Sequence, residues 1–371
     1  MASITRHEAI LADGRELLYF DDADTALGPE RAIDARVLDP RPDTATMRQD
    51  PLTAEWVSIA AARQNRVFLP PADQDPLAPA SPSNPSEIPS NYDVAVFENR
   101  SPSFGPALGG DNAPQGLADL DDLGIGRTRT SIGRCEVVCF SPETHGSFGS
   151  QTVSRARTVI EAWADRTAAL SALPGIQQVF PFENRGEAIG VTLHHPHGQI
   201  YAYPYITPRT QRLISSIERM PDLFARVLEF ELASERVVLR GEHWSAFVPF
   251  AARWPLEVHM LPHRHVPDFA ATNEAERDEL APMYRTILRG LDRIYDSETP
   301  YISAWHQAPV NVHRDDIRLM LQVTSPRRAA DKLKYLAGSE AAMGAWIGDV
   351  APEHTAGLVR GGIEAARRDD S

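Results

Sequence analysis

Apolar residues follow two periods along this chain, and together they predict helices and strands in a regular order. In residues 151–170 apolar side chains recur every three or four positions, which predicts an amphipathic helix that ends near Pro174-Gly175. Shorter apolar or alternating runs predict strands around this helix. They cover residues 56–60, 93–99, 134–140, 177–183, 187–193 and 194–206.

The second half of the chain repeats the order of strand, helix, strand and strand. GEHWSAFVPF and PLEVHMLP predict strands, and a helix with Leu280 and Ile287 on its apolar face follows them. Pro282 marks either a kink in this helix or a later start. Two further strands are predicted at 300–305 and 317–324. This repetition at matching spacing predicts an internal duplication of one α/β unit.

The length of 371 residues exceeds one ordinary hydrophobic core, so we predict two globular units or one internally duplicated unit. Residues 1–43 are polar and acidic with little periodicity, and they form a predicted N-terminal extension. Residues 44–205 and 206–350 are the two predicted halves, and residues 351–371 are a predicted C-terminal tail.

Composition and charge narrow the class of protein. The hydrophobic fraction of 42% and the charged fraction of 24% are those of a folded soluble protein. The net charge of −14 argues against a nucleic-acid-binding surface, which would be basic. No apolar run approaches the ~18 residues of a membrane helix, and the N-terminus lacks the features of a signal peptide. We therefore expect a cytoplasmic protein with no membrane and no nucleic-acid partner.

The two cysteines fit this expectation. Cys135 and Cys139 lie on one predicted strand, and four residues of strand span roughly 13 Å. That separation is too large for a disulfide. We expect two reduced core cysteines, since a zinc site would need a second close pair.

The string His195-Pro196-His197-Gly198-Gln199 carries the strongest chemical signal. Successive side chains of a strand point to opposite faces, so His195, His197 and Gln199 are predicted to share one face. Gly198 lets the backbone approach a ligand closely. A neutral imidazole is a good nucleophile near pH 7, and an amide donates hydrogen bonds to phosphoryl oxygens. The alternative is a solvated polar strand face with incidental histidines.

The HPHGQ string is similar to the active-site motif of the galactose-1-phosphate uridylyltransferases, a branch of the histidine triad superfamily. Further strings follow in the family's order, and the resemblance extends from residue 46 to about residue 348. They are DPLTAEW, FENRGEAIGVTL, GEHWSAFVPFAARWP, AWHQAP and LKYLAGSE. The resemblance implies an α+β class, with a duplicated histidine-triad-like fold of two antiparallel-sheet halves and packed helices.

The resemblance also implies a nucleotidyltransferase with a ping-pong reaction. His197 would attack the α-phosphorus of UDP-glucose, and Gln199 would donate to a phosphoryl oxygen. Galactose 1-phosphate would then take the uridylyl group to give UDP-galactose. Two alternatives stay open: a nucleotide-sugar phosphorylase or hydrolase on the same scaffold, and a non-catalytic nucleotide-sugar binding protein.

Other site residues follow from the resemblance alone. Arg63 and Arg66 match the family's paired arginines for anion binding, and Asn99 matches its uridine-binding loop. The phosphates would contact a segment around residues 184–192, and the hexose a segment around residues 334–335. The residues concerned are Asn184, Gly190, Thr192, Lys334 and Tyr335. The family implies a homodimer with substrate sites completed across the interface, and no organic cofactor.

Metal binding is where the chain departs from the family. Many bacterial relatives hold a structural zinc with a Cys-Pro-Leu-Cys segment and two histidines, and here Asp75-Pro76-Leu77-Ala78 replaces that segment. His145 and His195, with an oxygen of Asp75, remain as zinc candidates, against ordinary hydrogen-bonded histidines.

A second metal site of some relatives is expected to be absent. His265 matches one of its ligands, but Met320 and Gln322 stand where two histidines are expected. The remaining histidines of the second half are predicted to be structural or surface residues, namely His259, His263, His306 and His313.

Overall fold

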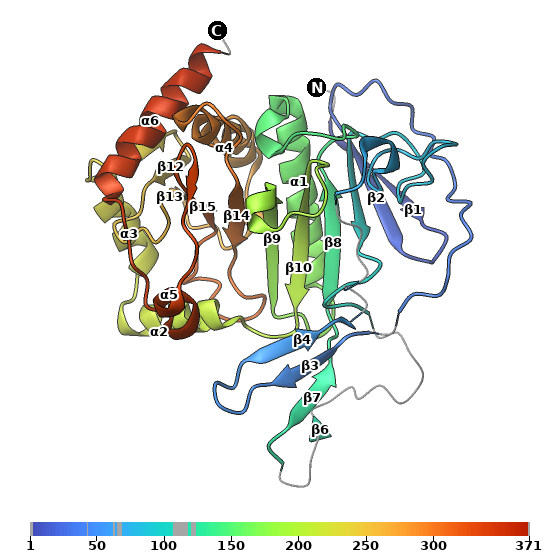
Figure 1. Cartoon of the computed structure of the whole chain (residues 1–371), viewed down its shortest axis with the longest axis horizontal. Helices are drawn as coiled ribbons and strands as arrows, with labels where there is room; N and C mark the ends of the chain where they lie inside the picture. Colours follow the sequence, from blue (N-terminus) through green and yellow to red (C-terminus); the bar gives the residue numbers. More distant parts are fainter. Residues whose placement is uncertain are drawn as a thin grey trace.

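The computed structural model describes residues 3–42, 44–61, 64, 69–106, 118–119 and 124–369, without the side chains of 118–119. One sheet of eleven strands runs through the molecule, and every neighbouring pair of its strands is antiparallel (Figure 1). In spatial order its strands are β1 (Thr5–Ile10), β2 (Glu16–Asp21), β5 (Val94–Glu98), β8 (Arg134–Cys139), β10 (His197–Tyr203), β9 (Gln178–Arg185), β14 (Tyr301–His306), β15 (Met320–Ser325), β13 (Leu256–Pro262), β12 (Trp244–Phe247) and β11 (Val237–Arg240).

The internal duplication is visible in the strand order. Strands β9 and β14 pair at the centre of the sheet, so the two halves join edge to edge. Outward from this pair, the order β10, β8, β5 on one side mirrors β15, β13, β12 on the other. His197 begins β10, and Met320 begins β15 at the corresponding place. The predicted α+β class with two antiparallel halves is confirmed.

Helices cover both faces of the sheet unequally. On one face, α1 (Val153–Ser171), α4 (Glu274–Ile294) and α6 (Pro352–Arg368) build the main hydrophobic core with the apolar positions of the strands. On the other face, α2 (Pro208–Arg219) and α3 (Leu223–Leu232) pack over the second half only. Among the described residues, no such helix pair covers the corresponding face of the first half, which holds His197 and Gln199.

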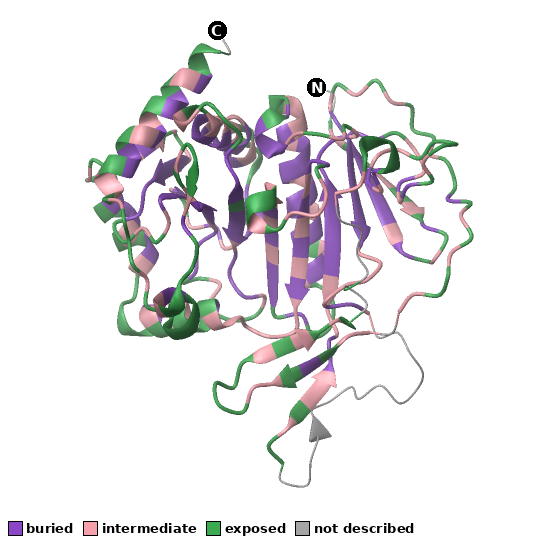
Figure 2. Cartoon of the chain, in the orientation of Figure 1, coloured by how far each residue is buried: buried purple, intermediate pink, exposed green. Residues whose placement is uncertain are grey.

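Smaller elements complete the fold. A second sheet has the order β4 (Trp56–Ile59), β3 (Thr46–Gln49), β7 (Arg127–Thr130) and β6 (Ala118–Asp119), and it projects from the large sheet (Figure 1). Strands β4 and β7 of this sheet are more exposed than β8 in the large sheet (Figure 2). The rest are β16 (Arg327–Ala329), β17 (Lys332–Leu333), α5 (Gly338–Met343) and the short 3₁₀ turns η2 (Ala72–Gln74), η3 (Phe148–Ser150), η4 (Glu187–Ile189) and η5 (Phe269–Ala271).

Two expectations about individual elements need correction. Residues 187–193, predicted as a strand, form the turn η4 and an irregular segment, because Gly186 and Gly190 adopt φ angles of 97° and 83° that break an extended chain. Of the two alternatives for Pro282, a kink or a late start of the second-half helix, the late start does not occur. Asn273 caps α4 with a capping box to Glu276, so the helix begins at Glu274 and runs through the proline.

Both ends of the chain contribute regular structure. Strands β1 and β2 extend the large sheet, and α6 packs along α4. The segment limits at residues 43, 205 and 350 stay predictions. Cys135 and Cys139 are both buried and unbridged, as expected. Among the described helices, none combines the length and the apolar character needed to cross a membrane.

Candidate active site

His197 stands at the first position of β10 with its ring orientation fixed by the backbone. Its Nδ1 lies 2.7 Å from the carbonyl oxygen of His195. A carbonyl only accepts hydrogen bonds, so in the neutral imidazole Nδ1 carries the ring proton and Nε2 carries the lone pair. The imidazole is thus held in the tautomer whose Nε2 is the nucleophilic atom.

Gln199 follows on the same side of β10. The burial along this strand alternates, with Gly198 and Ile200 buried and with His197 and Gln199 half-buried. A Cβ at Gly198 would lie 2.8 Å from the ring of Phe140 and 2.9 Å from the carbonyl oxygen of Phe182. The close packing of the strand on this side therefore requires glycine.

The predicted shared face does not extend to His195. Strand β10 begins only at His197, because Pro196 has no N–H for the ladder. The His195 ring turns inward instead and is 3% exposed.

Two cavities meet at His197. One of about 320 Å³ is lined by His197 and Gln199 together with Asn99 and Thr192. The other, of about 340 Å³, is lined by His197 and Asn184 among others. Gly190 lies next to them, where it ends the turn η4 in the left-handed conformation. The fold therefore gathers these predicted residues, which are far apart in sequence, around one imidazole.

Other predicted residues lie elsewhere. Lys334 is buried, with Nζ 3.3 Å from a carboxylate oxygen of Glu340 and hydrogen-bonded to the Arg253 and Ile347 carbonyls. Tyr335 is 73% exposed. Neither lines the two cavities at His197. Arg63 and Arg66 lie outside the described residues.

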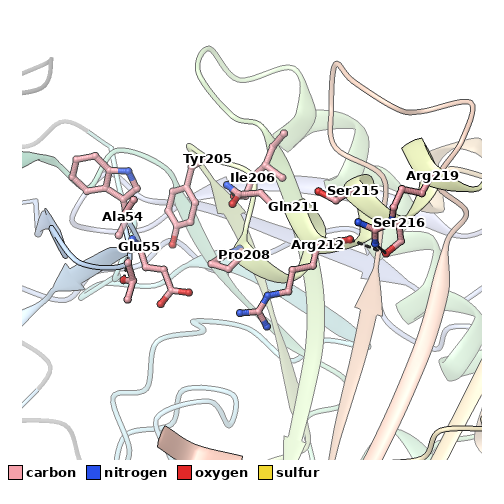
Figure 3. Close-up of a pocket in the computed structure, with 12 residues that line it drawn as sticks. Ala54, Glu55, Tyr205, Ile206, Pro208, Gln211, Arg212, Ser215, Ser216 and Arg219 are labelled. Atoms are coloured by element: carbon pink, nitrogen blue, oxygen red, sulfur yellow. Dashed lines mark hydrogen bonds between the residues drawn. The ribbon is translucent and has the colours of Figure 1, made fainter. Parts of the chain in front are cut away.

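A separate cavity of about 490 Å³ lies between residues 53–56 and helix α2 (Figure 3). Its lining is largely polar, with Glu55, Gln211 and Arg212 among its residues (Figure 3). None of the described residues assigned to chemistry lines it. The candidate active site is therefore the pair of cavities at His197.

Sequence comparison identifies the family. The chain matches the family model described as galactose-1-phosphate uridyl transferase, N-terminal domain, over residues 38–207, and the corresponding C-terminal domain over residues 216–328. The galactose-1-phosphate uridylyltransferase of Streptomyces lividans is 46% identical over 331 residues, which cover 85% of this chain and 86% of that protein.

The chain belongs to the galactose-1-phosphate uridylyltransferase family. The enzyme of the same name from Thermotoga maritima is 35% identical, covering 85% of this chain and 97% of that one. A solved uridylyltransferase structure has a TM-score of 0.75 at 26% identity, with 86% and 99% of the two chains covered. An ADP-glucose phosphorylase from Arabidopsis thaliana, solved with bound ADP-glucose, shares the fold at a TM-score of 0.62 and 21% identity. The chain is accordingly an enzyme of the nucleotidyltransferase class.

The zinc expected in many members of this uridylyltransferase family does not fit the residues present. Of the three candidate ligands, Asp75 and His195 meet directly, with Oδ2 of Asp75 2.7 Å from Nδ1 of His195. Nε2 of His195 lies 2.9 Å from both the Tyr92 hydroxyl and the Ser141 carbonyl oxygen. Both ring nitrogens are thus engaged. His145 is exposed, hydrogen-bonds Thr144 and stacks on His194.

This geometry predicts that chelation leaves the enzyme folded. A structural zinc contributes many kcal/mol to folding, so its removal lowers the melting temperature by many degrees. We expect the melting temperature with excess EDTA to stay within about 1 °C of the untreated value, and elemental analysis to give far less than one zinc per chain. Stoichiometric zinc together with unfolding on chelation would contradict this.

The second metal site of the family is also rearranged. Met320 and Gln322 line one cavity with His306, whereas His265 does not line it and hydrogen-bonds the Arg314 carbonyl. Two other histidines lie beside Gln322: His306 at 3.1 Å, and His259, which pairs with it across strands β13 and β15. Burial, with the nearby Arg209 charge, lowers the pKa of His306 to about 3, so its ring is neutral. No cluster of three metal-binding side chains occurs among the described residues.

Sequence reasoning missed several residues at the site. Tyr92 and the Ser141 carbonyl hold His195, and a backbone carbonyl leaves no sequence signal at all. Arg15 and Arg100 line the cavity of His197 and Gln199. Arg15 is 1% exposed and donates to the Glu98 carbonyl. The only signal for it is a charged residue at the start of the apolar run GRELLYF.

Glu183 on β9 is buried next to the site, and it makes stability depend on pH. Burial raises its pKa from the ordinary value of 4.5 to about 7, although the Phe148 N–H and the Tyr301 hydroxyl donate to it. A carboxyl with a raised folded pKa stabilises the fold fully below pH 4.5. This contribution is lost as the pH rises through about 7.

We expect Glu183→Gln to abolish this dependence. The free energy of unfolding of the wild type should fall relative to the variant by about 3 kcal/mol between pH 5 and pH 8. The amide can keep both contacts, since its oxygen accepts from Phe148 and its N–H₂ donates to the Tyr301 oxygen. Urea unfolding of both proteins across this range measures the difference. If the free energies of unfolding of the two proteins changed in parallel with pH, Glu183 would have the same pKa in the folded and unfolded states, which would contradict the prediction.

Proposed function

We propose that the chain transfers the uridylyl group of UDP-glucose to galactose 1-phosphate through a covalent uridylyl-histidine at His197. The observation that carries this proposal is the hydrogen bond from Nδ1 of His197 to the His195 carbonyl, which leaves the lone pair on Nε2. This nitrogen belongs to a side chain that lines two cavities with Gln199, Asn99 and Asn184. The relatives are named galactose-1-phosphate uridylyltransferases, and these names support the proposed substrates.

The first half-reaction forms the intermediate. Nε2 of His197 attacks the α-phosphorus, the bond from that phosphorus to the bridging oxygen breaks, and glucose 1-phosphate leaves with the electron pair. The ring gains positive charge as the P–N bond forms. The His195 carbonyl at 2.7 Å from Nδ1 stabilises that charge. The leaving sugar phosphate is a stable anion, so the step needs no general acid.

The second half-reaction reverses the first with a different acceptor. A phosphate oxygen of galactose 1-phosphate attacks the same phosphorus, the P–N bond breaks, and the imidazole returns to its starting state. UDP-galactose is the product. The Gln199 amide donates to a non-bridging oxygen in both steps, where negative charge builds up.

The binding roles follow the two cavities. Asn99 and Thr192 line the cavity with Gln199, which is the proposed uridine and α-phosphate side. The Asn99 Oδ1 accepts the Ser101 N–H at 3.0 Å, which orients the side chain. Asn184 lines the second cavity, next to Gly190, and is assigned to the phosphates. Arg63 and Arg66 are assigned to the same anion on the sequence alone.

We infer that the hexose side is completed by a second copy of the chain. Lys334 and Tyr335 resemble the family's sugar-binding segment, yet neither lines a cavity at His197 in its own chain. Tyr335 is largely exposed and available to a partner. A homodimer that places Tyr335 at the partner's His197 reconciles the two facts. A cytoplasmic location stays a prediction.

The test is product analysis with alternative acceptors. The enzyme is incubated with UDP-glucose labelled in the uridine, together with galactose 1-phosphate, inorganic phosphate or buffer alone. The proposal expects label in UDP-galactose with the first acceptor, and little UDP or UMP with the others. Rapid formation of UDP with phosphate or of UMP with water would replace the proposal by a phosphorylase or a hydrolase. Binding of UDP-glucose without formation of any product would show that the chain is a nucleotide-sugar binding protein.

A further inference from the structure

Asp75, Tyr92 and His195 form a cluster of side chains. The hydrogen-bond acceptors in this cluster determine which atoms carry its protons. The Tyr92 hydroxyl gives its one proton to the Leu77 carbonyl at 2.7 Å, and the Ser141 carbonyl only accepts. Nε2 of His195 must therefore donate to them. Asp75 faces Nδ1. Burial alone would raise the pKa of this carboxyl, but the hydrogen bond and charge of His195 hold it below its usual range.

Both ring nitrogens of His195 therefore lie within hydrogen-bond distance of protein oxygens, Nδ1 at 2.7 Å from Asp75 and Nε2 at 2.9 Å from both Tyr92 and Ser141. A metal ion could reach neither nitrogen without displacing one of these partners. The residues present therefore differ from a zinc site in two ways. The two cysteines are absent, and the His195 ring is oriented toward protein oxygens.

The cluster connects four segments that are distant in sequence. Asp75 follows the turn η2, and Tyr92 lies just before β5. Ser141 follows β8, and His195 leads into β10. Asp75 and Tyr92 are also tied to each other through Leu77, whose N–H donates to Asp75 at 2.9 Å and whose carbonyl accepts from Tyr92. All the side chains of the cluster are buried. A structural metal would connect its ligands in the same way.

The cluster reaches the nucleophile through one peptide group. The His195 carbonyl accepts Nδ1–H of His197 at 2.7 Å, so any rotation of the His195 backbone would move the atom that sets the His197 tautomer. Fixing the His195 ring at both nitrogens opposes that rotation.

We propose that Asp75 and Tyr92 are positioning residues that replace a structural metal, holding His195 so that its carbonyl orients the nucleophile His197. The inference rests on the proposed function for its catalytic consequence only. It predicts a defect in the chemical step rather than in substrate binding, because neither Asp75 nor Tyr92 lines a cavity at His197.

The experiment compares four variants. Asp75→Ala removes the acceptor at Nδ1 and should lower kcat about 10²-fold, the size of effect that misplacement of a reacting group produces. The KM for UDP-glucose should stay within about threefold, since the binding residues are untouched. Tyr92→Phe, which leaves the Ser141 carbonyl in place, should lower kcat less. Asp75→Asn can keep a hydrogen bond to Nδ1 of His195 and should recover most of the activity. Asp73→Ala is the matched control, on an exposed carboxylate two positions away, and should behave as wild type.

Nitrogen NMR of histidine-labelled enzyme provides a readout without turnover. Signals are assigned by their loss in His195→Gln and His197→Gln. In the wild type, His197 should show a single Nδ1–H tautomer. In Asp75→Ala, the His197 ring should become a mixture of tautomers.

Three results would overturn the proposal: an unchanged His197 tautomer in Asp75→Ala, a kcat equal to the wild type in that variant, or a stoichiometric zinc in the wild-type enzyme. A wild type that forms no UDP-galactose, but whose His197 tautomer depends on Asp75, would instead overturn the proposed function and leave the positioning role standing.

Discussion

His197→Ala is expected to abolish uridylyl transfer, with kcat reduced by more than about 10⁴-fold, as is typical when an attacking residue is removed. The methyl group offers no lone pair to the α-phosphorus, and no second imidazole stands on β10, because the His195 ring is turned inward and both its nitrogens are engaged. His197 is half-buried and lines the two cavities, so the fold should survive its replacement. Steady-state assays with circular dichroism measure both properties.

A variant with a smaller side chain at position 197 distinguishes loss of the nucleophile from disruption of the binding site. His197→Gly leaves space where the ring was, so an added uridylyl-imidazole can occupy it and supply the pre-formed reagent. We expect this variant to make UDP-galactose from uridylyl-imidazole and galactose 1-phosphate, but not from UDP-glucose. Substantial turnover of UDP-glucose by a correctly folded His197→Ala would show that another group attacks.

Gln199→Glu is expected to lose most of its uridylyl-transfer activity at neutral pH. Loss of one well-aimed donor typically costs about 2.7–4 kcal/mol of transition-state stabilisation, or ~10²–10³ in rate. The glutamate also adds negative charge beside an anionic phosphoryl group. Both effects act on the step in which charge develops, so kcat should fall more than the affinity for UDP-glucose. Single-turnover release of glucose 1-phosphate measures the step directly.

Gln199→Ala is the matched control for charge. It removes the donor without adding a carboxylate, so it should be impaired but less so than Gln199→Glu. Both variants should bind UDP-glucose, because Asn99 and Thr192 of the same cavity are unchanged. If Gln199→Glu turned over at the wild-type rate, the side chain would not face the phosphorus, although it lines the cavity with His197.

Local periodicity was sufficient for much of the fold. The amphipathic pattern at 151–170 corresponds to α1, and the runs at 134–140 and 300–305 correspond to β8 and β14. The prediction failed at 187–193, where an apolar run of strand type is interrupted by glycine at Gly190. There the left-handed φ of the glycine outweighs side-chain propensity.

Elements whose pairing is distant in sequence were harder to predict. Strands β1 and β2 lie in a polar segment, and only the short run GRELLYF has the burial of a core strand. Their place at the edge of the large sheet depends on β5, far along the chain. No local pattern contains that information.

For the site, sequence was informative about residues and less so about their contacts. The motif predicted His197 and Gln199 on one side of a strand, which the alternating burial of β10 supports. Asp75 and His195 were expected as metal ligands, but the structure joins them by a direct hydrogen bond. A carboxylate can either bind a metal or accept from an imidazole, and only the ring orientation distinguishes the two.

The central claim is a covalent uridylyl group on His197. The most direct measurement is mass spectrometry of the intact chain and of its peptides after brief exposure to UDP-glucose without an acceptor, with quenching and digestion at alkaline pH to preserve the P–N bond. The account predicts about one uridylyl group per active site, located on the peptide that contains His197 and removed by galactose 1-phosphate as UDP-galactose forms. Continued turnover with no labelled peptide, or a label on a different residue, would contradict it.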